Sequence, residues 1–261
     1  MTDFPSGQWL APGAYERGRS FPGSATVDAV LPVYNERHIL AASVGRLRRF
    51  LLEHADFAWR IVIADNASID GTLAEAQRLA ERHPDVAVMH IPQKGRGRAL
   101  HAAWTETNAD VRTYMDIDLS TGLPAYLDLV RAIALEGYDV AIGTRLHPRS
   151  AVSRSLRRDL ISQAYNVIIK LAFDTRFSDA QCGFKAIGAS AAERLLPLIA
   201  DGEWFFDTEL LIVAERNGLR IKDVPVVWLE DPDTRVNVRR TALRDLRGLA
   251  RLRFRGVPAL E

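Results

Sequence analysis

The sequence has almost no net charge, a single cysteine and no long hydrophobic run, and each of these shortages excludes a class of protein. Its 34 Lys and Arg residues nearly balance 33 Asp and Glu residues, so we expect no nucleic-acid partner. Cys182 is the only cysteine, so no intramolecular disulfide can form and a reducing cytoplasm is the expected compartment. No apolar run reaches the length of a transmembrane helix.

The composition is otherwise that of an ordinary globular chain. Hydrophobic residues make up 48% and charged residues 26% of the 261 positions, which suits one large domain with appendages. Residues 1–25 are polar and rich in Gly and Pro, so we expect a flexible N-terminal arm. We expect residues 26–233 to form the main domain and residues 234–261 a basic, amphipathic C-terminal extension.

Hydrophobic periodicity predicts strands that alternate with helices. Short apolar, β-branched runs predict strands over 27–33, 59–64, 86–91, 111–115 and 140–142. Apolar residues at helical spacing predict helices over 39–51, 73–80, 98–107 and 127–135. This alternation is typical of an α/β fold in which helices cover both faces of a mainly parallel sheet.

Polar residues follow each of the five predicted strands. They are Tyr-Asn-Glu at 34–36, Asp-Asn-Ala-Ser-Ile-Asp-Gly-Thr at 65–72, Lys-Gly-Arg-Gly-Arg at 94–98, Asp-Ile-Asp at 116–118 and Gly-Thr-Arg at 143–145. Ligands of such sheets bind beyond the carboxyl ends of the strands, so we expect one site at this edge. Taken singly, Asn35, Glu36, Asp70 or Thr72 could equally cap a helix, and the glycines could only turn the chain.

Asp116 and Asp118 give the clearest chemical signal at this edge. Alternation along a strand points two residues in these positions the same way. Mg²⁺ is usually held by one or two carboxylates together with substrate oxygens, so the pair predicts a divalent cation beside a bound diphosphate. Residues 94–98 lack both the Gly-Lys-Ser/Thr of a Walker loop and the spacing of a dinucleotide fingerprint, and predict a flexible basic loop near phosphate.

Six sequence blocks occur in order. They are Leu-Pro-Val-Tyr-Asn-Glu (31–36), Asp-Asn-Ala-Ser-Ile-Asp-Gly-Thr (65–72), Asp-Ile-Asp-Leu-Ser-Thr (116–121), Gly-Thr-Arg (143–145), Asp-Ala-Gln-Cys-Gly-Phe-Lys (179–185) and Trp-Phe-Phe-Asp-Thr-Glu-Leu-Leu (204–211). On these blocks the chain resembles family 2 glycosyltransferases of the Rossmann-like GT-A fold. It is most similar to the polyprenyl- and dolichyl-phosphate sugar transferases. The Gln-Cys-Gly-Phe-Lys block favours the dolichyl-phosphate β-glucosyltransferase branch, with the mannosyltransferases next.

The resemblance implies roles for residues on the donor side. Pro32, Tyr34 and Glu36 would line the nucleoside pocket, and Asp65 would accept a hydrogen bond from the base. Asp116 would face the nucleotide and the metal, and Asp118 would ligate Mg²⁺ or Mn²⁺ bridging the diphosphate.

Further roles concern the phosphates, the sugar and the acceptor. Lys94 belongs to the basic loop, and Arg145 would contact sugar or phosphate. Arg158 and Ser162 fall where relatives hold the acceptor phosphate, and Gln181 would line the donor-sugar and acceptor side. Asp207 and Glu209 lie where many inverting relatives keep a general base. The expected set of phosphate-handling arginines comprises Arg154, Arg157, Arg158, Arg235, Arg239 and Arg240.

The chemistry of the acceptor decides whether a base is needed. A hydroxyl acceptor needs a base to remove its proton. A lipid monophosphate, with a second pKa of about 6, is already largely anionic at neutral pH. We therefore expect inverting transfer of a hexose, from UDP-glucose or next from GDP-mannose, to a polyprenyl phosphate, with Asp207 as an orienting group or a helix cap. The alternatives are a soluble or glycan hydroxyl acceptor, for which Asp207 would be an essential base, and a non-catalytic nucleotide-sugar-binding protein.

Two segments suggest contact with a lipid surface. From Asn237 onward, apolar residues share one helical face and arginines occupy much of the rest, a pattern typical of helices on anionic membranes. The alternative is a terminal helix packed on the domain with its arginines in water. Residues 160–173 are rich in Ile, Val and Leu and could lie near the bilayer or in the core. We expect a cytoplasmic protein, peripheral on the cytoplasmic face of a membrane.

Overall fold

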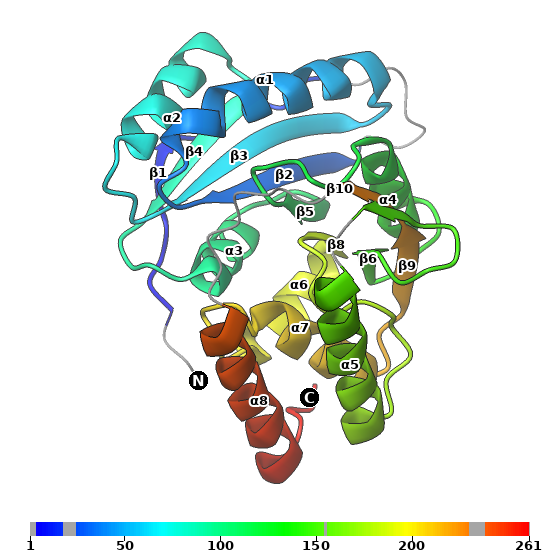
Figure 1. Cartoon of the computed structure of the whole chain (residues 1–261). Helices are drawn as coiled ribbons and strands as arrows, with labels where there is room; N and C mark the ends of the chain where they lie inside the picture. The colour runs from blue at the N-terminus through cyan, green and yellow to red at the C-terminus, as the bar shows by residue number, and fades with distance from the viewer. Residues whose placement is uncertain (1–3, 18–24, 154–155, 230–237, 261) are drawn as a thin grey trace.

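The computed structural model describes residues 4–17, 25–153, 156–229 and 238–260, except for the side chains of 156–161 and 238–240. An eight-stranded sheet forms its centre (Figure 1). In spatial order its strands are β1 (Gln8–Ala11), β4 (Val86–Ile91), β3 (Ala58–Asn66), β2 (Thr26–Val33), β5 (Val111–Met115), β8 (Phe184–Gly188), β6 (Val140–Thr144) and β9 (Ile221–Pro225). A separate parallel pair consists of β7 (Ala151–Ser153) and β10 (Val227–Leu229).

Helices cover both faces of this sheet, as the alternating pattern predicts. One face packs against α1 (Arg37–His54), α2 (Thr72–Arg82) and α4 (Pro124–Ala134). The other packs against α3 (Arg96–Thr105), α5 (Leu156–Phe173), α6 (Ala189–Leu195), α7 (Phe206–Arg216) and α8 (Val238–Arg255). A short 3₁₀ turn over Leu196–Leu198 follows α6. The predicted α/β fold is confirmed.

The strands of the sheet are mainly, but not wholly, parallel. β4, β3, β2 and β5 pair in parallel, and so do β6 and β9. β8 lies between β5 and β6 and is antiparallel to both. β5 and β6 therefore run in the same direction, and their carboxyl ends lie at the same edge. The segment that enters β8 reaches that edge from the opposite direction.

The N-terminal segment contains structure that the sequence did not indicate, and the C-terminal helix packs on the domain, one of the two alternatives that the sequence left open. Within the expected flexible arm of residues 1–25, β1 pairs antiparallel with β4 and covers an edge of the sheet. At the other end, α8 packs on the domain through Leu249 and Leu252, which are 5% and 2% exposed. Within the described residues, no helix combines the length and apolarity needed to cross a membrane.

Candidate active site

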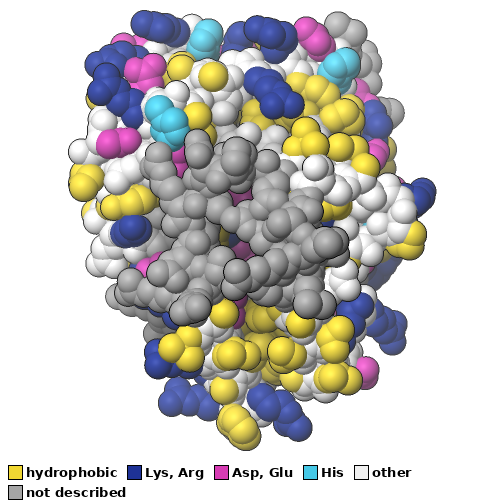
Figure 2. All heavy atoms as spheres, in the orientation of Figure 1, with side chains coloured by type: hydrophobic (Ala, Val, Ile, Leu, Met, Phe, Trp, Pro, Cys, Tyr) yellow, Lys and Arg dark blue, Asp and Glu magenta, His cyan; other side chains and the backbone are white. Residues whose placement is uncertain are grey.

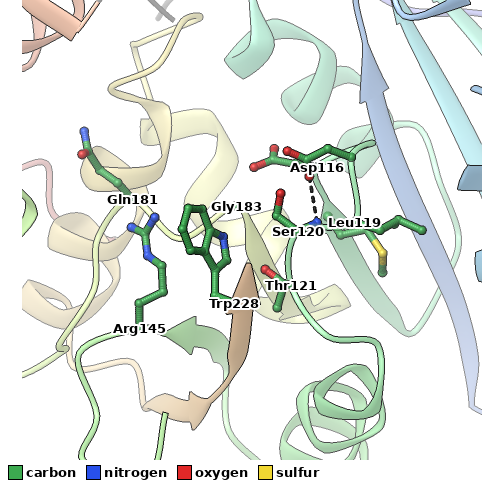
Figure 3. A pocket seen from close by; sticks show the side chains of 10 residues that line it. Asp116, Leu119, Ser120, Thr121, Arg145, Gln181, Gly183 and Trp228 are labelled. Atoms are coloured by element: carbon green, nitrogen blue, oxygen red, sulfur yellow. Dashed lines mark hydrogen bonds between the residues drawn. The ribbon is translucent and has the colours of Figure 1, made fainter. Parts of the chain in front are cut away.

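The site lies at the carboxyl edge of the sheet, where two of the five predicted polar segments, those after β5 and β6, line one cavity. Asp116 and Asp118 follow β5, and Arg145 follows β6. Because β8 is antiparallel, Gln181 and Gly183, which precede it, come to the same edge. These residues line a cavity of about 70 Å³ together with Met115, Leu119, Ser120, Thr121 and Trp228 (Figure 3).

Asp116 and Asp118 line this cavity from a turn, not from a strand. The expected strand alternation is wrong here because β5 ends at Met115. The Leu119 amide donates to the Asp116 carbonyl at 3.1 Å, and Leu119 adopts a positive φ of 51°. The Ser120 amide donates to Asp118 Oδ1 at 2.9 Å, which fixes the second carboxylate (Figure 3). The two carboxylates thus reach one cavity by a different route from the one predicted.

Gly183 makes close approach to Asp116 possible. Its carbonyl accepts from the Asp116 amide at 3.1 Å, and any Cβ at Gly183 would overlap the Asp116 carboxylate. The glycine in the Gln-Cys-Gly-Phe-Lys block is therefore required by the position of the first aspartate.

Arg96 connects Asp116 to the interior of the protein. Its guanidinium donates to Asp116 Oδ1 at 2.8 Å and to Asp207 Oδ2 at 2.5 Å. Only 11% of the Arg96 side chain is exposed, whereas 46% of the Asp116 side chain is exposed. Arg96 thus fixes one oxygen of a solvent-facing carboxylate from a buried anchor.

Asp207 is that anchor, and all its described contacts are with donors. Besides Arg96, it accepts from the Tyr114 hydroxyl and lies 3.0 Å from Lys185 Nζ, whose side chain is fully buried. Burial alone would raise the pKa of Asp207, but the charges of Lys185 and Arg96 and the Tyr114 hydrogen bond outweigh it, and the net pKa is lowered. A carboxylate held this way is poorly suited to accept a proton.

Arg145 reaches the cavity as predicted, but it is already ion-paired. Its Nε and Nη2 donate to the two oxygens of buried Asp179 at 2.8 and 2.9 Å. Burial opposes ionisation of both groups, yet their mutual attraction raises the pKa of Arg145 and lowers that of Asp179. The Arg145 guanidinium carbon lies 5.6 Å from the centre of the Trp228 ring, which forms a wall of the cavity (Figure 3). The pairing pre-orients Arg145 for a ligand in the cavity.

Gln181 connects the cavity to the C-terminal helix. Its Nε2 donates to Asp245 Oδ2 at 2.6 Å. Asp245 is 2% exposed, although it lies in the arginine-rich helix α8. Burial raises its pKa to about 6 despite the hydrogen bond from Gln181. Glu209 also meets α8, because its Oε2 accepts from Arg251 at 2.8 Å.

The predicted nucleoside residues gather at the ends of β2, β3 and β4. Asp65 is fully buried, and its Oδ2 lies 2.7 Å from His90 Nδ1. Lys94 Nζ lies 3.6 Å from the centre of the Tyr34 ring. Pro32 is the partner of Ala64 in the β2–β3 register, next to the pair formed by Val33 and Asp65.

Several polar residues beside this pocket are occupied in holding loops. The Glu36 amide donates to Thr72 Oγ1 at 2.9 Å, and the Ile69 amide donates to Asn35 Oδ1 at 2.9 Å. Asp70 accepts from the Thr72 amide at 3.0 Å. These contacts are structural, but Asn35, Asp70 and Thr72 are not the N-cap residues that the sequence allowed: Glu36 and Gly71 are the N-caps of α1 and α2, and neither makes a side-chain capping hydrogen bond.

The acceptor-side residues are only partly described. Ser162 lies in α5, where its carbonyl accepts from the Asn166 side chain at 2.9 Å, and it does not line the cavity. The remaining expected arginines, Arg154, Arg157, Arg158, Arg235, Arg239 and Arg240, lie outside the described side chains.

Some residues at the site were given no role from the sequence. Tyr114, Lys185 and Asp179 reach the site only through the β5–β8–β6 pairing, although Asp179 and Lys185 belong to the 179–185 block. His90 looks like one polar residue in an apolar strand until the β3–β4 register places it beside Asp65. Arg96 was expected only as part of a flexible loop, yet it begins α3 and is largely buried.

Comparison with known proteins gives a consistent picture. The sequence model described as "Glycosyl transferase family 2" matches residues 28–196. The chain is 34% identical over 238 residues to "Glycosyltransferase AglD" of Haloferax volcanii, covering 87% of this chain but 37% of that protein. It is 27% identical to "Dolichyl-phosphate beta-glucosyltransferase ALG5C" of Trichomonas vaginalis, covering 83% and 68%. It is 32% identical to "Polyprenol monophosphomannose synthase" of Mycolicibacterium smegmatis, covering 77% and 76%.

Solved structures show the same fold. Glucosyl-3-phosphoglycerate synthase of Mycobacterium tuberculosis, crystallised with Mn²⁺ and UDP-glucose, superposes with a TM-score of 0.64 at 18% identity, covering 92% of this chain and 86% of that one. A second crystal structure of the same enzyme superposes with a TM-score of 0.65 at 20% identity, covering 91% of this chain and 88% of that one. The architecture is that of GT-A glycosyltransferases.

Proposed function

The chain belongs to glycosyl transferase family 2, and we propose that it transfers a hexose from a nucleoside-diphosphate sugar, UDP-glucose in the first place, to a polyprenyl monophosphate. Relatives named for dolichyl-phosphate glucosylation and polyprenol phosphomannose synthesis support this acceptor class. GDP-mannose is the second candidate donor, because a mannose-named relative is also similar over most of its length.

One observation carries the choice of a phosphate acceptor. Asp207, the candidate general base, is 2% exposed and is held by Arg96, Tyr114 and Lys185. A phosphate that is already anionic needs no proton removed before it attacks. A hydroxyl acceptor would instead require a base of suitable pKa within hydrogen-bond reach. The engaged carboxylate therefore fits a phosphate nucleophile.

The proposed reaction is a direct displacement at the sugar. A phosphate oxygen of the acceptor forms a bond to the anomeric carbon while the bond from that carbon to the nucleoside diphosphate breaks, and the electron pair leaves on the diphosphate. Attack opposite the leaving group inverts the anomeric configuration. Arg145, oriented by Asp179, would stabilise charge in the cavity through preorganised hydrogen bonding.

Asp116 and Asp118 fit a divalent cation. Both line the cavity, and Asp116 is half-exposed toward it. The described residues hold no group of three or more His, Cys, Asp or Glu that could hold a metal ion, so the diphosphate oxygens of the donor would complete the coordination. When bound, Mg²⁺ or Mn²⁺ would neutralise the charge that develops on the leaving diphosphate. Structural relatives crystallised with Mn²⁺ support this assignment.

A surface formed by α5 and α8 suits a membrane that contains the lipid acceptor. These helices contact each other, and large apolar side chains on both are exposed. The apolar patch consists of Val167, Ile168, Leu171, Leu243, Leu246 and Phe254. Figure 2 shows hydrophobic side chains gathered at this end of the molecule, with Lys and Arg side chains around them.

Charge and position support peripheral docking of this patch. Arg247, Arg253 and Arg255 are exposed on the same helix α8. Apolar side chains flanked by arginines favour the interface of an anionic bilayer, where each cation near the surface contributes about 1 kcal/mol. The partly buried contact between Asp245 of α8 and Gln181 connects this surface to the cavity.

Vesicle binding tests the docking surface. The double substitution Leu171→Gln and Phe254→Gln removes its two most exposed apolar side chains, which are 84% and 87% exposed. We expect strongly reduced sedimentation with vesicles containing phosphatidylserine, while Leu52→Gln on α1 retains wild-type binding. Equal binding by the double variant and the wild type would reject this surface.

A donor panel tests the activity itself. UDP-glucose, GDP-mannose and other labelled donors are incubated with Mg²⁺ and polyprenyl phosphate, and label entering the organic phase is counted. We expect transfer from UDP-glucose. Label appearing only in a soluble glycan would support the hydroxyl-acceptor alternative, and nucleotide-sugar binding without any transfer would support a non-catalytic binder.

A further inference from the structure

Arg96 places a fixed positive charge beside the two aspartates of the cavity. Its Nη2 donates to Asp116 Oδ1 at 2.8 Å. Asp116 and Asp118 both line the cavity, and 46% of the Asp116 side chain is exposed. One oxygen of a candidate metal ligand is therefore already bound to a cation that belongs to the protein.

The surroundings of Arg96 keep this cation in place. Its guanidinium carbon lies 5.0 Å from the centre of the Tyr114 ring and 5.1 Å from the centre of the Trp204 ring. Its Nη1 donates to Asp207 Oδ2, and only 11% of its side chain is exposed. An arginine held by two rings and a buried carboxylate keeps its charge at one position, since its guanidinium stays protonated in proteins.

Gly97, next in the chain, allows this placement. A Cβ at Gly97 would lie 2.7 Å from the Phe206 Cβ and 2.8 Å from the Gly202 carbonyl carbon. Only a residue without a side chain lets the start of α3 approach that segment so closely. The basic segment at 94–98 was expected to be a flexible loop near phosphate, yet its local structure brings a buried guanidinium to Asp116.

Positive and negative charges nearly cancel at and behind the cavity. The acidic groups are Asp116, Asp118, Asp179 and Asp207, and the basic groups are Arg96, Arg145 and Lys185. Four negative and three positive charges leave a net charge of −1. A divalent cation gains little from so small a charge, and a guanidinium beside its ligand repels it. A nucleoside diphosphate brings the missing negative charge and the phosphate oxygens that Mg²⁺ usually binds.

We propose that Arg96 is a built-in counter-cation: by holding Asp116 it weakens the affinity of the two aspartates for a divalent cation alone, so that the metal enters with the nucleoside diphosphate. This inference rests on the proposed function, because it concerns the donor site of the same reaction. Arg96 acts through Asp116 and is a positioning residue. Its charge attracts a diphosphate and repels a metal ion, so its removal should change the two affinities in opposite directions.

Separate titrations of the cation and of the nucleotide test the proposal. Electron paramagnetic resonance of free Mn²⁺ measures metal binding without nucleotide, and calorimetry with a chelator measures UDP and GDP binding without metal. Arg96→Gln and Arg96→Met remove the charge, and Arg96→Lys keeps it. Arg48→Gln is the matched control, because Arg48 pairs with buried Asp85 at 2.7 Å, beside the amino end of β4. Circular dichroism reports whether each variant is folded.

We expect Arg96→Gln and Arg96→Met to bind Mn²⁺ at least about tenfold more tightly than the wild type, because a unit charge beside a divalent cation has at least that effect. The same variants should bind the nucleoside diphosphate about tenfold more weakly without metal. Arg96→Lys and Arg48→Gln should stay close to the wild type in both titrations. A merely structural role for Arg96 would weaken metal and nucleotide binding together.

The wild type provides a second measurement. UDP or GDP should strengthen its Mn²⁺ binding at least about tenfold, after correction for the Mn²⁺ that the nucleotide binds in buffer alone. Three results would overturn the proposal: Mn²⁺ binding that is not tighter in the neutral variants, metal and nucleotide affinities that fall together, or wild-type Mn²⁺ binding that neither nucleotide strengthens. If no Arg96 variant folds, the wild-type comparison still decides. Failure of lipid-phosphate transfer would reject the proposed function and leave these titrations unchanged.

Discussion

Replacing Asp207 with Asn distinguishes an orienting carboxylate from a general base. The substitution keeps the size of the side chain but removes the negative charge that faces Arg96 and fully buried Lys185. Leaving a buried charge without its partner costs about 3–5 kcal/mol. We expect the free energy of unfolding of Asp207→Asn to fall by about that amount near pH 7.

Asp207→Asn should reduce the rate of transfer by less than the removal of a general base would. Without Asp207, Arg96 loses one of its two anchors, and Asp116 loses a fixed partner. We expect a loss of about tenfold in kcat/KM for the donor, the scale of one hydrogen bond to a charged group. Removal of a general base reduces the rate by about 10²–10⁴-fold.

A second substitution separates stability from chemistry. In the double variant Asp207→Asn, Lys185→Met, the unpaired buried lysine is absent, so most of the lost stability should return. Urea unfolding measures the stability, and steady-state transfer to polyprenyl phosphate measures the activity. A stable double variant whose turnover is reduced about a thousandfold, and is restored by added formate as an external base, would refute the orienting role.

Three further predictions concern the cavity and α8. Gly183→Ala should weaken UDP-glucose binding at least about tenfold, measured by calorimetry, because its Cβ would displace the Asp116 carboxylate. As a control, Gly45→Ala, in open space on α1, should stabilise the fold by about 0.5–1 kcal/mol, measured by urea unfolding. Asp118→Asn should abolish transfer and leave the unfolding midpoint unchanged, since the residue is exposed; wild-type rates would reject its metal role. The folded-state pKa of Asp245, about 6, lies above its reference value of 3.8, so its contribution to stability is present below pH 3.8 and is lost as pH rises through 6. The free energy of unfolding of Asp245→Asn should therefore be about 1–2 kcal/mol higher than that of the wild type at pH 8 and equal to it near pH 4. Equal stability of the two proteins at pH 8 would contradict this prediction.

The sequence predicts five of the eight strands of the sheet, those that local patterns determine. The strands at 86–91 and 111–115 match β4 and β5 to the residue, because each is an apolar run between clear turn signals. β8 was not predicted, since its central, antiparallel position depends on pairing with strands far away in the chain. β1 was missed because a short edge strand within a polar, Gly- and Pro-rich segment carries little periodicity.

In the site, too, residues in local motifs were predicted and their partners from distant parts of the chain were not. Asp116, Asp118, Arg145 and Gln181 were predicted because they belong to contiguous motifs, and the structure places all four around one cavity. The partners that fix them were not predictable. Asp179 holds Arg145 and Asp245 holds Gln181 across 34 and 64 positions of sequence, and the second contact comes from the helix expected as a basic, amphipathic extension.

The central claim is that an already ionised phosphate attacks the sugar without a general base. The most direct test compares initial rates of transfer from UDP-glucose to two acceptors with the same lipid chain, polyprenyl phosphate and polyprenol. Only the first carries an anionic nucleophile at pH 7. We expect a glucosyl phosphodiester product with polyprenyl phosphate and no measurable transfer to polyprenol. Comparable rates with both acceptors would show that an ionised phosphate is not required.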